Sequence, residues 1–262
     1  MHWMQSKTEG EIRIMEKKDL LIKLQKQEQI HVILSKCTRL PHVHCDAETY
    51  DDEIFVFFDE KDAAAKAEKF TEAGELVVVV PIPNKNFLPF YSGLFPMGVN
   101  AIVVDGDTEN ETCIQLEELV RKPDDSKLPK GQVRIENPSL HLTGMYFMQE
   151  LRKKMRTELD ENLLEMQQEM LSHFSTGTYV VALKSDQKGV VLMKNPQGQT
   201  ALPIFTDIQE FQKFQMSSPQ EKFLPGIVQA DKVGGMLPPE ASTVILNPMG
   251  INVPLNVAKK NK

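Results

Sequence analysis

The chain has 262 residues, of which 41% are hydrophobic, so it has enough apolar material for one large or two ordinary globular domains. Its 37 acidic residues outnumber its 30 basic ones, and the formal net charge is -7. Nucleic-acid binders generally carry a basic excess, so we expect no DNA or RNA partner.

The chain shows no sign of export or of membrane insertion. Its N-terminal segment has no apolar stretch typical of a signal peptide, and the longest apolar run, VVVVPIP at 77–83, is interrupted by prolines. The three cysteines, Cys37, Cys45 and Cys113, are too few for a disulfide framework. We therefore expect a cytoplasmic protein that makes no contact with a membrane.

The stretch CTRLPHVHCD at 37–46 raises the question of a metal site. Zinc sites commonly use four Cys or His ligands with a CxxC pair, which this stretch lacks. A strand here would place His42, His44 and Asp46 on one face and Cys45 on the other. Two alternatives remain: a metal site of these three residues, or a solvated edge face, which we favour. We expect no cofactor.

A strand followed by a helix is predicted for IFVFFDEKDAAAKAEKF at 54–70. Asp59 suits the N-cap of that helix, where a carboxylate can accept free backbone N–H groups. The expected buried stripe consists of Ala63, Ala67 and Phe70.

Two acidic stretches and one thiol in the first half were considered as further sites. DGDTENE at 105–111 begins like a calcium loop but has Asn110 where glycine is needed, so a surface turn is favoured. AETYDDE at 47–53 is interpreted as a solvated loop. Cys113 is expected at a helix N-terminus, as a buried packing residue rather than a reactive thiol.

The region between the halves predicts two helices. The residues at 151–156 are basic and those at 157–169 are acidic, an order that would oppose the dipole of a single helix. We expect one helix to end near Arg156 and the next to be capped by Thr157, with Asp160 completing a capping box.

Apolar residues spaced three or four apart run through both linker helices and must be covered. Two alternatives remain: the stripe packs as core, or it forms a partner or dimer surface, for which methionine is well suited. The candidates for partner binding are Met148, Met155, Met166 and Met170. The whole stripe is Met148, Leu151, Met155, Leu159, Leu163, Met166, Met170 and Phe174.

The second half repeats the pattern of the first. ALPIFTDIQEFQKF at 201–214 predicts a strand and an Asp207-capped helix, whose expected stripe is Ile208, Phe211 and Phe214. Pro-Met-Gly occurs at 96–98 and again at 248–250, so we align the two and predict a tight turn before the last strand of each copy. In each turn Pro fixes φ and Gly permits a positive φ.

These elements predict an α+β fold, with two copies of a mixed β-sheet domain with packed helices joined by a helical linker. We expect residues 1–14 to be an over-extended N-terminus, with Met15 as the natural start. The expected units are an N-terminal extension and helix at 1–29, copy one at 30–125, the linker at 126–175 and copy two at 176–262.

Four segments resemble the N-terminal domain of the SseB, or enhanced serine sensitivity, proteins of bacteria. They are LPIFTDIQEFQKF at 202–214, ILNPMGINVPL at 245–255, ETYDDEIFVFFDEKDAAAKA at 48–67 and the linking NPSLHLTGMYFMQELRKKM at 137–155. Together they extend the resemblance over most of residues 30–257. Copy one departs from it at Phe58, which stands where copy two has Thr206.

The resemblance implies a tandem cytoplasmic protein linked by name to serine tolerance, and it supplies no catalytic residues. Since no reactive constellation is evident in the sequence either, we expect a non-enzymatic protein-interaction or regulatory module. We expect it to bind a protein partner or to self-associate. The alternative is a small-ligand or metal-binding module that uses His42 and His44 or the cleft between the repeats.

Overall fold

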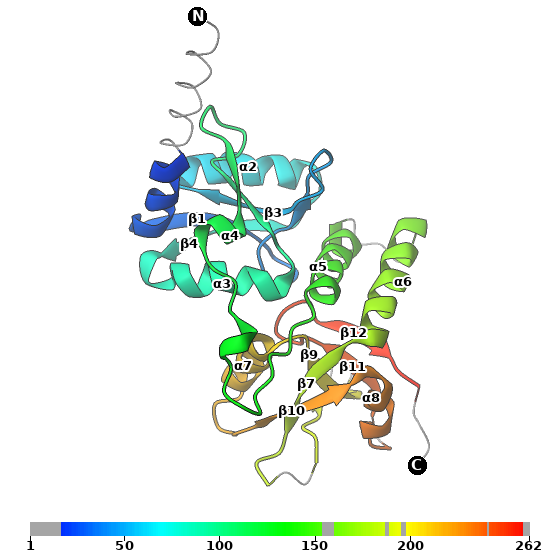
Figure 1. The fold of residues 1–262 in the computed structure, drawn as a ribbon. Coiled ribbons are helices and arrows are strands. Elements are labelled where there is room, and N and C mark those ends of the chain that lie inside the picture. The colour runs from blue at the N-terminus through cyan, green and yellow to red at the C-terminus, as the bar shows by residue number, and fades with distance from the viewer. Residues whose placement is uncertain (1–16, 154–159, 187–188, 195–197, 240, 259–262) are drawn as a thin grey trace, which may run out of the picture.

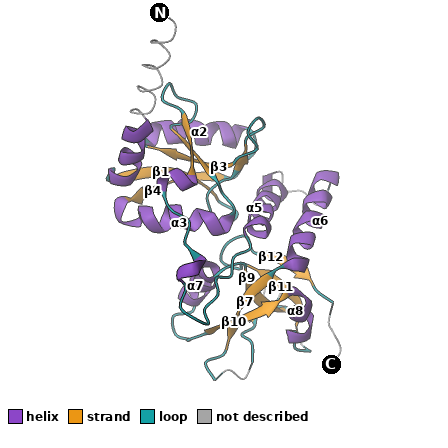
Figure 2. Cartoon of the chain, in the orientation of Figure 1, coloured by secondary structure: helices purple, strands orange, loops and turns teal. Residues whose placement is uncertain are grey.

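The structure is a computed structural model that describes residues 17–153, 160–186, 189–194, 198–239 and 241–258. It contains two six-stranded mixed sheets with helices packed on them, which confirms the predicted α+β fold with two similar copies (Figures 1 and 2). The expected N-terminal extension at 1–14 lies outside the described residues.

The two sheets have the same topology. The first has the order β4-β1-β3-β5-β6, with β2 paired to β3, and the second has the order β10-β7-β9-β11-β12, with β8 paired to β9. In each sheet one central pair is parallel, β3 with β5 and β9 with β11. The strands are β1 Gln29–Ser35, β2 His44–Cys45, β3 Asp52–Phe57, β4 Val77–Pro83, β5 Ala101–Val104, β6 Thr112–Gln115, β7 Thr178–Leu183, β8 Met193–Lys194, β9 Thr200–Phe205, β10 Leu224–Gln229, β11 Ala241–Leu246 and β12 Val253–Asn256.

Helices cover the sheets and join them. A helix that includes residues 17–26 precedes β1, as α6 precedes β7, so the repeat begins earlier in each copy than the sequence indicates. The named helices are α2 Glu60–Glu72, η1 Asn84–Asn86, α3 Phe87–Met97, α4 Leu116–Leu119, η2 Asp125–Lys127, α5 Pro138–Lys153, α6 Glu161–Thr176, α7 Ile208–Ser217 and α8 Ala230–Met236.

Both predicted aspartate caps are confirmed. The side chain of Asp59 accepts a hydrogen bond from a backbone N–H in the first turn of α2, and that of Asp207 accepts two in α7. The predicted stripe of α2 packs against the sheet, but that of α7 is wrong at Ile208, which is 43% exposed. Phe211 and Phe214 pack this short helix against its sheet.

The alignment of the two Pro-Met-Gly sequences is wrong. The first ends α3 and precedes β5, whereas the second follows β11, which is the counterpart of β5. Gly98 has the predicted positive φ, 86°, as the C-cap of α3. Gly250 has no positive φ; a Cβ there would lie 2.9 Å from Oε2 of Glu210, so close approach explains this glycine.

The residues that are equivalent after β5 and β11 differ in type. Asp105 and Asn247 both adopt positive φ, 50° and 46°, and both follow a parallel strand. Each side chain accepts a backbone N–H at the end of the neighbouring strand, from Phe58 at 3.0 Å and from Thr206 at 2.9 Å. Asp and Asn both tolerate a positive φ and form local hydrogen bonds, so two different residue types can occupy this position of the fold.

The linker forms two helices, as predicted. The N-cap of α6 is Asp160, whose side chain accepts a hydrogen bond from the N–H of Leu163. The predicted role of Asp160 as the residue that completes a capping box is therefore wrong, because Asp160 is itself the cap. The cap expected at Thr157, and the helix end expected near Arg156, lie outside the described residues.

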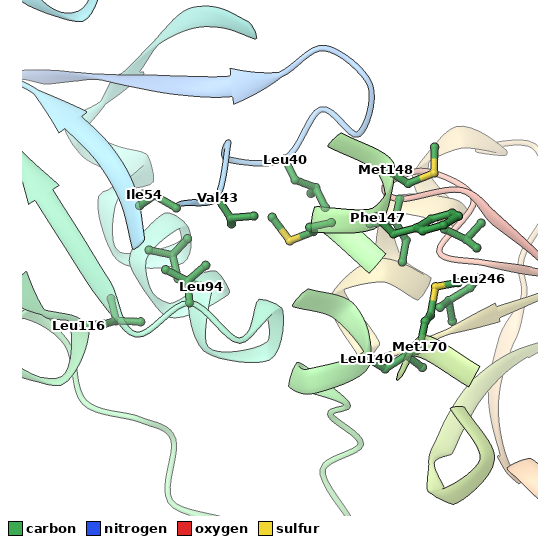
Figure 3. Close-up of a cluster of buried hydrophobic side chains, with 14 of the residues drawn as sticks. Leu40, Val43, Ile54, Leu94, Leu116, Leu140, Phe147, Met148, Met170 and Leu246 are labelled. Atoms are coloured by element: carbon green, nitrogen blue, oxygen red, sulfur yellow. The ribbon is translucent and has the colours of Figure 1, made fainter. Parts of the chain in front are cut away.

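One continuous core contains apolar side chains from both sheets, from α5 and from α6. Figure 3 shows Phe147 and Met148 of α5 between Leu40 of the first copy and Leu246 of the second. The two copies therefore share a core through α5.

Prolines interrupt the outer edges of the sheets. At the end of the β1–β4 ladder the N–H of Asn84 donates to the carbonyl of Glu28, and alternation from that pair turns Pro81 and Pro83 outward. The same reasoning turns Pro225 outward on β10. Because proline has no N–H to offer an added strand, these edges discourage strand addition. None of the described helices combines the length and apolarity needed to cross a membrane.

We predict that Gly98→Ala lowers the free energy of unfolding by about 3 kcal/mol, because it combines a positive φ with a collision. The new Cβ would lie 2.8 Å from the carbonyl oxygen of Pro138, at the contact between α3 and α5. Gly131→Ala is the matched control, since φ is 89° and nothing lies within 4 Å. Urea unfolding followed by circular dichroism measures both, and equal losses would contradict the packing argument.

Candidate functional site

The first turn of α5 is fixed to the second sheet. Nδ2 of Asn137, the residue before the helix, donates to the carbonyl oxygens of Thr178 and Thr206 at 2.8 and 2.7 Å. A Cβ on Gly144 would lie 2.6 Å from Cδ1 of Ile251, so the helix backbone approaches the β11–β12 turn closely. This contact places His141 over the ends of β9 and β11.

His141 lies in a buried polar cluster together with four residues of the second copy: Thr206, Asp207, Glu210 and Asn247. Its Nδ1 is 3.2 Å from Oγ1 of Thr206 and 3.5 Å from Oδ2 of Asp207. Its Nε2 is 3.9 Å from Oε1 of Glu210. The imidazole therefore faces two carboxylates inside the protein.

Each member of the cluster has a structural task. Oγ1 of Thr206 donates to Asp207 and accepts from Nδ2 of Asn247. Burial raises the pKa of Asp207, but the hydrogen bonds and charge of His141 and the bond from Thr206 outweigh it and hold that pKa below its usual value. Lys213 pairs with Glu210 and partly balances the buried charge.

The combination of a hydroxyl, an imidazole and a carboxylate invites comparison with a nucleophilic triad. In a triad the nucleophile and the orienting carboxylate occupy opposite ring nitrogens. Here Thr206 and Asp207 are both at Nδ1, and the carboxylate nearest to Nε2, that of Glu210, is 3.9 Å away, beyond hydrogen-bond distance. The hydroxyl of Thr206 donates to Asp207 and has no exposed surface. The arrangement holds a helix in place and is not set up for nucleophilic attack.

The second half of α5 is fixed to the first sheet. Oε1 and Nε2 of Gln149 bond the N–H and the carbonyl of Val43, both at 3.0 Å. The hydroxyl of Tyr146 donates to Asp52 at 2.7 Å, and Lys153 pairs with Glu75 at 2.8 Å. Polar contacts at both ends thus fix α5 between the two copies.

The three metal candidates do not converge. His42 is buried with its ring 4.6 Å from that of Phe70, whereas Nδ1 of His44 bonds Glu53 at 3.1 Å. Asp46 accepts hydrogen bonds within its own loop. Within the described ranges no three His, Cys, Asp or Glu side chains could hold a metal ion. The favoured alternative, one solvated face of His42, His44 and Asp46, is wrong at His42, because β2 contains only two residues and the alternation does not extend to the buried His42 or to Asp46.

Burial raises the pKa of all three thiols, Cys37, Cys45 and Cys113. For Cys113 burial, followed by the negative charges of Glu53 and neighbouring aspartates, raises it to about 11. The prediction that Cys113 begins a helix and is buried is wrong: it lies in β6 and is exposed as a residue, although neighbouring atoms partly shield its thiol from water. Since thiolates are the nucleophilic form, these cysteines are not activated.

The two acidic stretches differ. The solvated loop expected at 47–53 is wrong at its end, because Asp52 and Glu53 belong to β3, where Glu53 is buried and pairs with His44. Asp107 pairs with Lys66 and Lys69, and its N–H is bonded by Glu111. The surface turn expected at 105–111 is thereby confirmed, since the carboxylate of Asp107 faces lysines rather than a cation site.

A cavity of about 430 Å³ opens where the first copy meets the start of α5. Its apolar wall comes from Phe95, Val99, Leu116 and Pro138, and its polar wall from Gly98, Asn100, Gln115, Glu117 and Lys122. This volume lies within the range of sites for small molecules or single side chains. The lining comes from three separate segments of the chain, at 95–100, 115–122 and Pro138, so no local pattern could have indicated the cavity.

The methionine candidates for partner binding lie mainly in the interior. Met148 and Met170 are 5% and 1% exposed and belong to the shared core, and Met166 packs against it. Met155 lies outside the described residues. The burial of these methionines agrees with the alternative in which the stripe packs as core, because the side chains of α5 and α6 pack on each other and join the core shared by both sheets.

The sequence matches no protein family, and no curated protein is similar to it. Two solved structures show a weak likeness. Anabaena Tic22, described as a protein of protein transport, is 12% identical over 83% of this chain and 84% of its own, with a TM-score of 0.22. Tic22 from Plasmodium falciparum is 11% identical over 87% and 90%, also with a TM-score of 0.22. At these TM-scores the likeness carries no argument about this chain.

We predict that His141→Ala lowers the free energy of unfolding by about 3 kcal/mol or more, because two buried carboxylates lose a facing imidazole. His173→Ala is the matched control: that side chain is partly exposed and pairs with Glu169 one helical turn away, so about 0.5 kcal/mol or less is expected. Chemical unfolding of both variants provides the measurement. A His141 variant as stable as the control would contradict the assigned role.

We predict an acid-sensitive contribution from His42. Burial, followed by the charges of His44 and Lys153, lowers its pKa from 6.5 to about 4. Between those values the unfolded chain binds a proton that the folded chain does not, so stability is present above pH 6.5 and falls as the pH drops toward 4. The full effect is about 3 kcal/mol.

His42→Leu should remove that part of the pH dependence. His44→Ala, at a half-exposed position, should retain most of it, because burial is a larger cause of the lowered pKa of His42 than the charge of His44. Urea unfolding at several pH values across this window measures the effect. If the decline in stability is the same in His42→Leu, the assignment to His42 is wrong.

Proposed function

We propose that this chain is a non-enzymatic binding protein of the SseB type, which acts through a protein partner in the bacterial cytoplasm and has a role linked to serine tolerance. The resemblance supports this proposal, because its two strongest segments, 202–214 and 245–255, correspond to β9–α7 and to β11–β12. These elements receive the first half of α5.

The observation that carries the proposal is a contrast between two places in the molecule: the His141 cluster is buried, whereas the cavity at the start of α5 is open to solvent. The hydroxyl, imidazole and carboxylate of the His141 cluster are sealed in the interior, and the three thiols are held in their neutral form. The cavity beside α5 is open, and its ionisable lining residues are Glu117 and Lys122, with no hydroxyl, imidazole or thiol among the lining side chains. A cavity with recognition groups but without an activated nucleophile favours binding over catalysis.

Site-specific photo-crosslinking in bacterial cells tests this proposal. A benzoylphenylalanine at Lys122, on the cavity, should capture a defined protein partner that the same group at Met216, 70% exposed on α7, does not capture. Incubation with the purified partner should leave the masses of both proteins unchanged. Equal capture at the two positions, or a covalent change in the partner, would contradict the proposal.

We call the cavity between the first copy and the start of α5 the junction cavity. The second candidate function is the binding of a small ligand there, which the volume of the cavity favours. Native mass spectrometry of gently desalted protein distinguishes the two. A small bound mass that is displaced by Phe95→Trp, which would narrow the cavity, would favour the small ligand over a protein partner.

A further inference from the structure

Negative charge exceeds positive charge around the junction cavity. Glu117 lines it, and within the described residues no hydrogen bond or ion pair engages its carboxylate. Directly behind the wall, the carboxylate of Asp51 accepts hydrogen bonds from Nδ2 of Asn100 and Nε2 of Gln115 at 2.6 and 2.8 Å. Since the amide groups of this wall are engaged internally, they leave the two carboxylates to set the field on this side.

The helix ends at the cavity carry opposite partial charges. Phe95 and the C-cap Gly98 place the negative C-terminus of α3 there, and Pro138 places the positive N-terminus of α5 there. These two contributions oppose each other, so the ionised side chains decide the sign of the potential in the cavity.

Lys122 is the cation of the lining. Arg134 and Lys122 together favour the ionised form of Glu136, against the effect of burial on its pKa. Glu117 faces the cavity with Asp51 behind it, and these two carboxylates outweigh the single ammonium of Lys122. Phe95 adds an aromatic ring that can pack against an alkyl stem or a cation.

We propose that the junction cavity receives a lysine or arginine side chain from a basic segment of the partner protein, with Glu117 as its ion-pair acceptor. This inference rests on the proposed binding function and names the chemistry of the partner. The cavity can enclose one long side chain, and the net charge of -7 favours encounter with a basic partner.

The test uses the capped peptide Gly-Gly-Lys-Gly-Gly, with glutamate and norleucine versions as controls, titrated into the full chain and followed by NMR amide shifts. The lysine peptide should shift residues 95–100 and 115–122, and it should bind more tightly than either control. Added salt should weaken binding, because the pair is accessible to solvent.

Two charge variants test whether the cavity prefers a positively charged side chain. Glu117→Gln should weaken binding of the lysine peptide about fivefold, whereas Lys122→Gln should leave it unchanged or strengthen it. Both residues are exposed, so thermal unfolding should confirm that each variant folds. Equal binding of the glutamate peptide, weaker binding in Lys122→Gln, or shifts confined to other elements would overturn the inference.

The outcome is separable from that of the crosslinking experiment. A partner captured at Lys122 combined with no preference for the lysine peptide would retain the binding function and reject the basic side chain. A concentration-dependent dimer whose contacts map to the cavity, with no response to the peptides, would identify a second copy of the chain as the occupant and would also overturn the inference.

Discussion

The structure depends on the burial of one helix, α5, between two sheets. A helix enclosed on several sides must both fill space and satisfy every polar group that it carries inward. Its apolar residues join the shared core, while His141 and Gln149 bond to opposite copies. The same side chains that solve the burial problem therefore set the relative position of the two sheets.

The two copies share a topology but do not use it in the same way. At the end of the parallel pair, copy two has Thr206 and Asn247, whose polar groups receive His141. Copy one has Phe58 at the position of Thr206, covered by the ammonium of Lys23 at 3.6 Å from the ring centroid. One backbone plan thus supports a polar docking site in one copy and an apolar surface with a cation in the other.

The distribution of chemistry within the molecule connects the fold to the proposed function. The hydroxyl, imidazole and carboxylates of the His141 cluster are engaged by internal contacts, and the edge strands β4 and β10 carry outward prolines. The junction cavity combines the charged side chains of Glu117 and Lys122 with an apolar wall. Because α5 fixes the start of the linker against the first copy, this cavity has a defined shape, which favours specific recognition at a low ordering cost.

The sequence by itself determined the features that depend on local physics. Periodicity, helix capping at Asp59 and Asp207, and the charge reversal in the linker predicted the elements and the repeated α+β fold, because neighbouring residues settle these matters. Only the tertiary structure decided which Pro-Met-Gly belonged to which turn, where His42 and His44 face, and which methionines are buried. These depend on strand order and on contacts between residues far apart in the chain, and no local pattern records them. The His141 cluster and the junction cavity are of this second kind, since each is assembled from several elements.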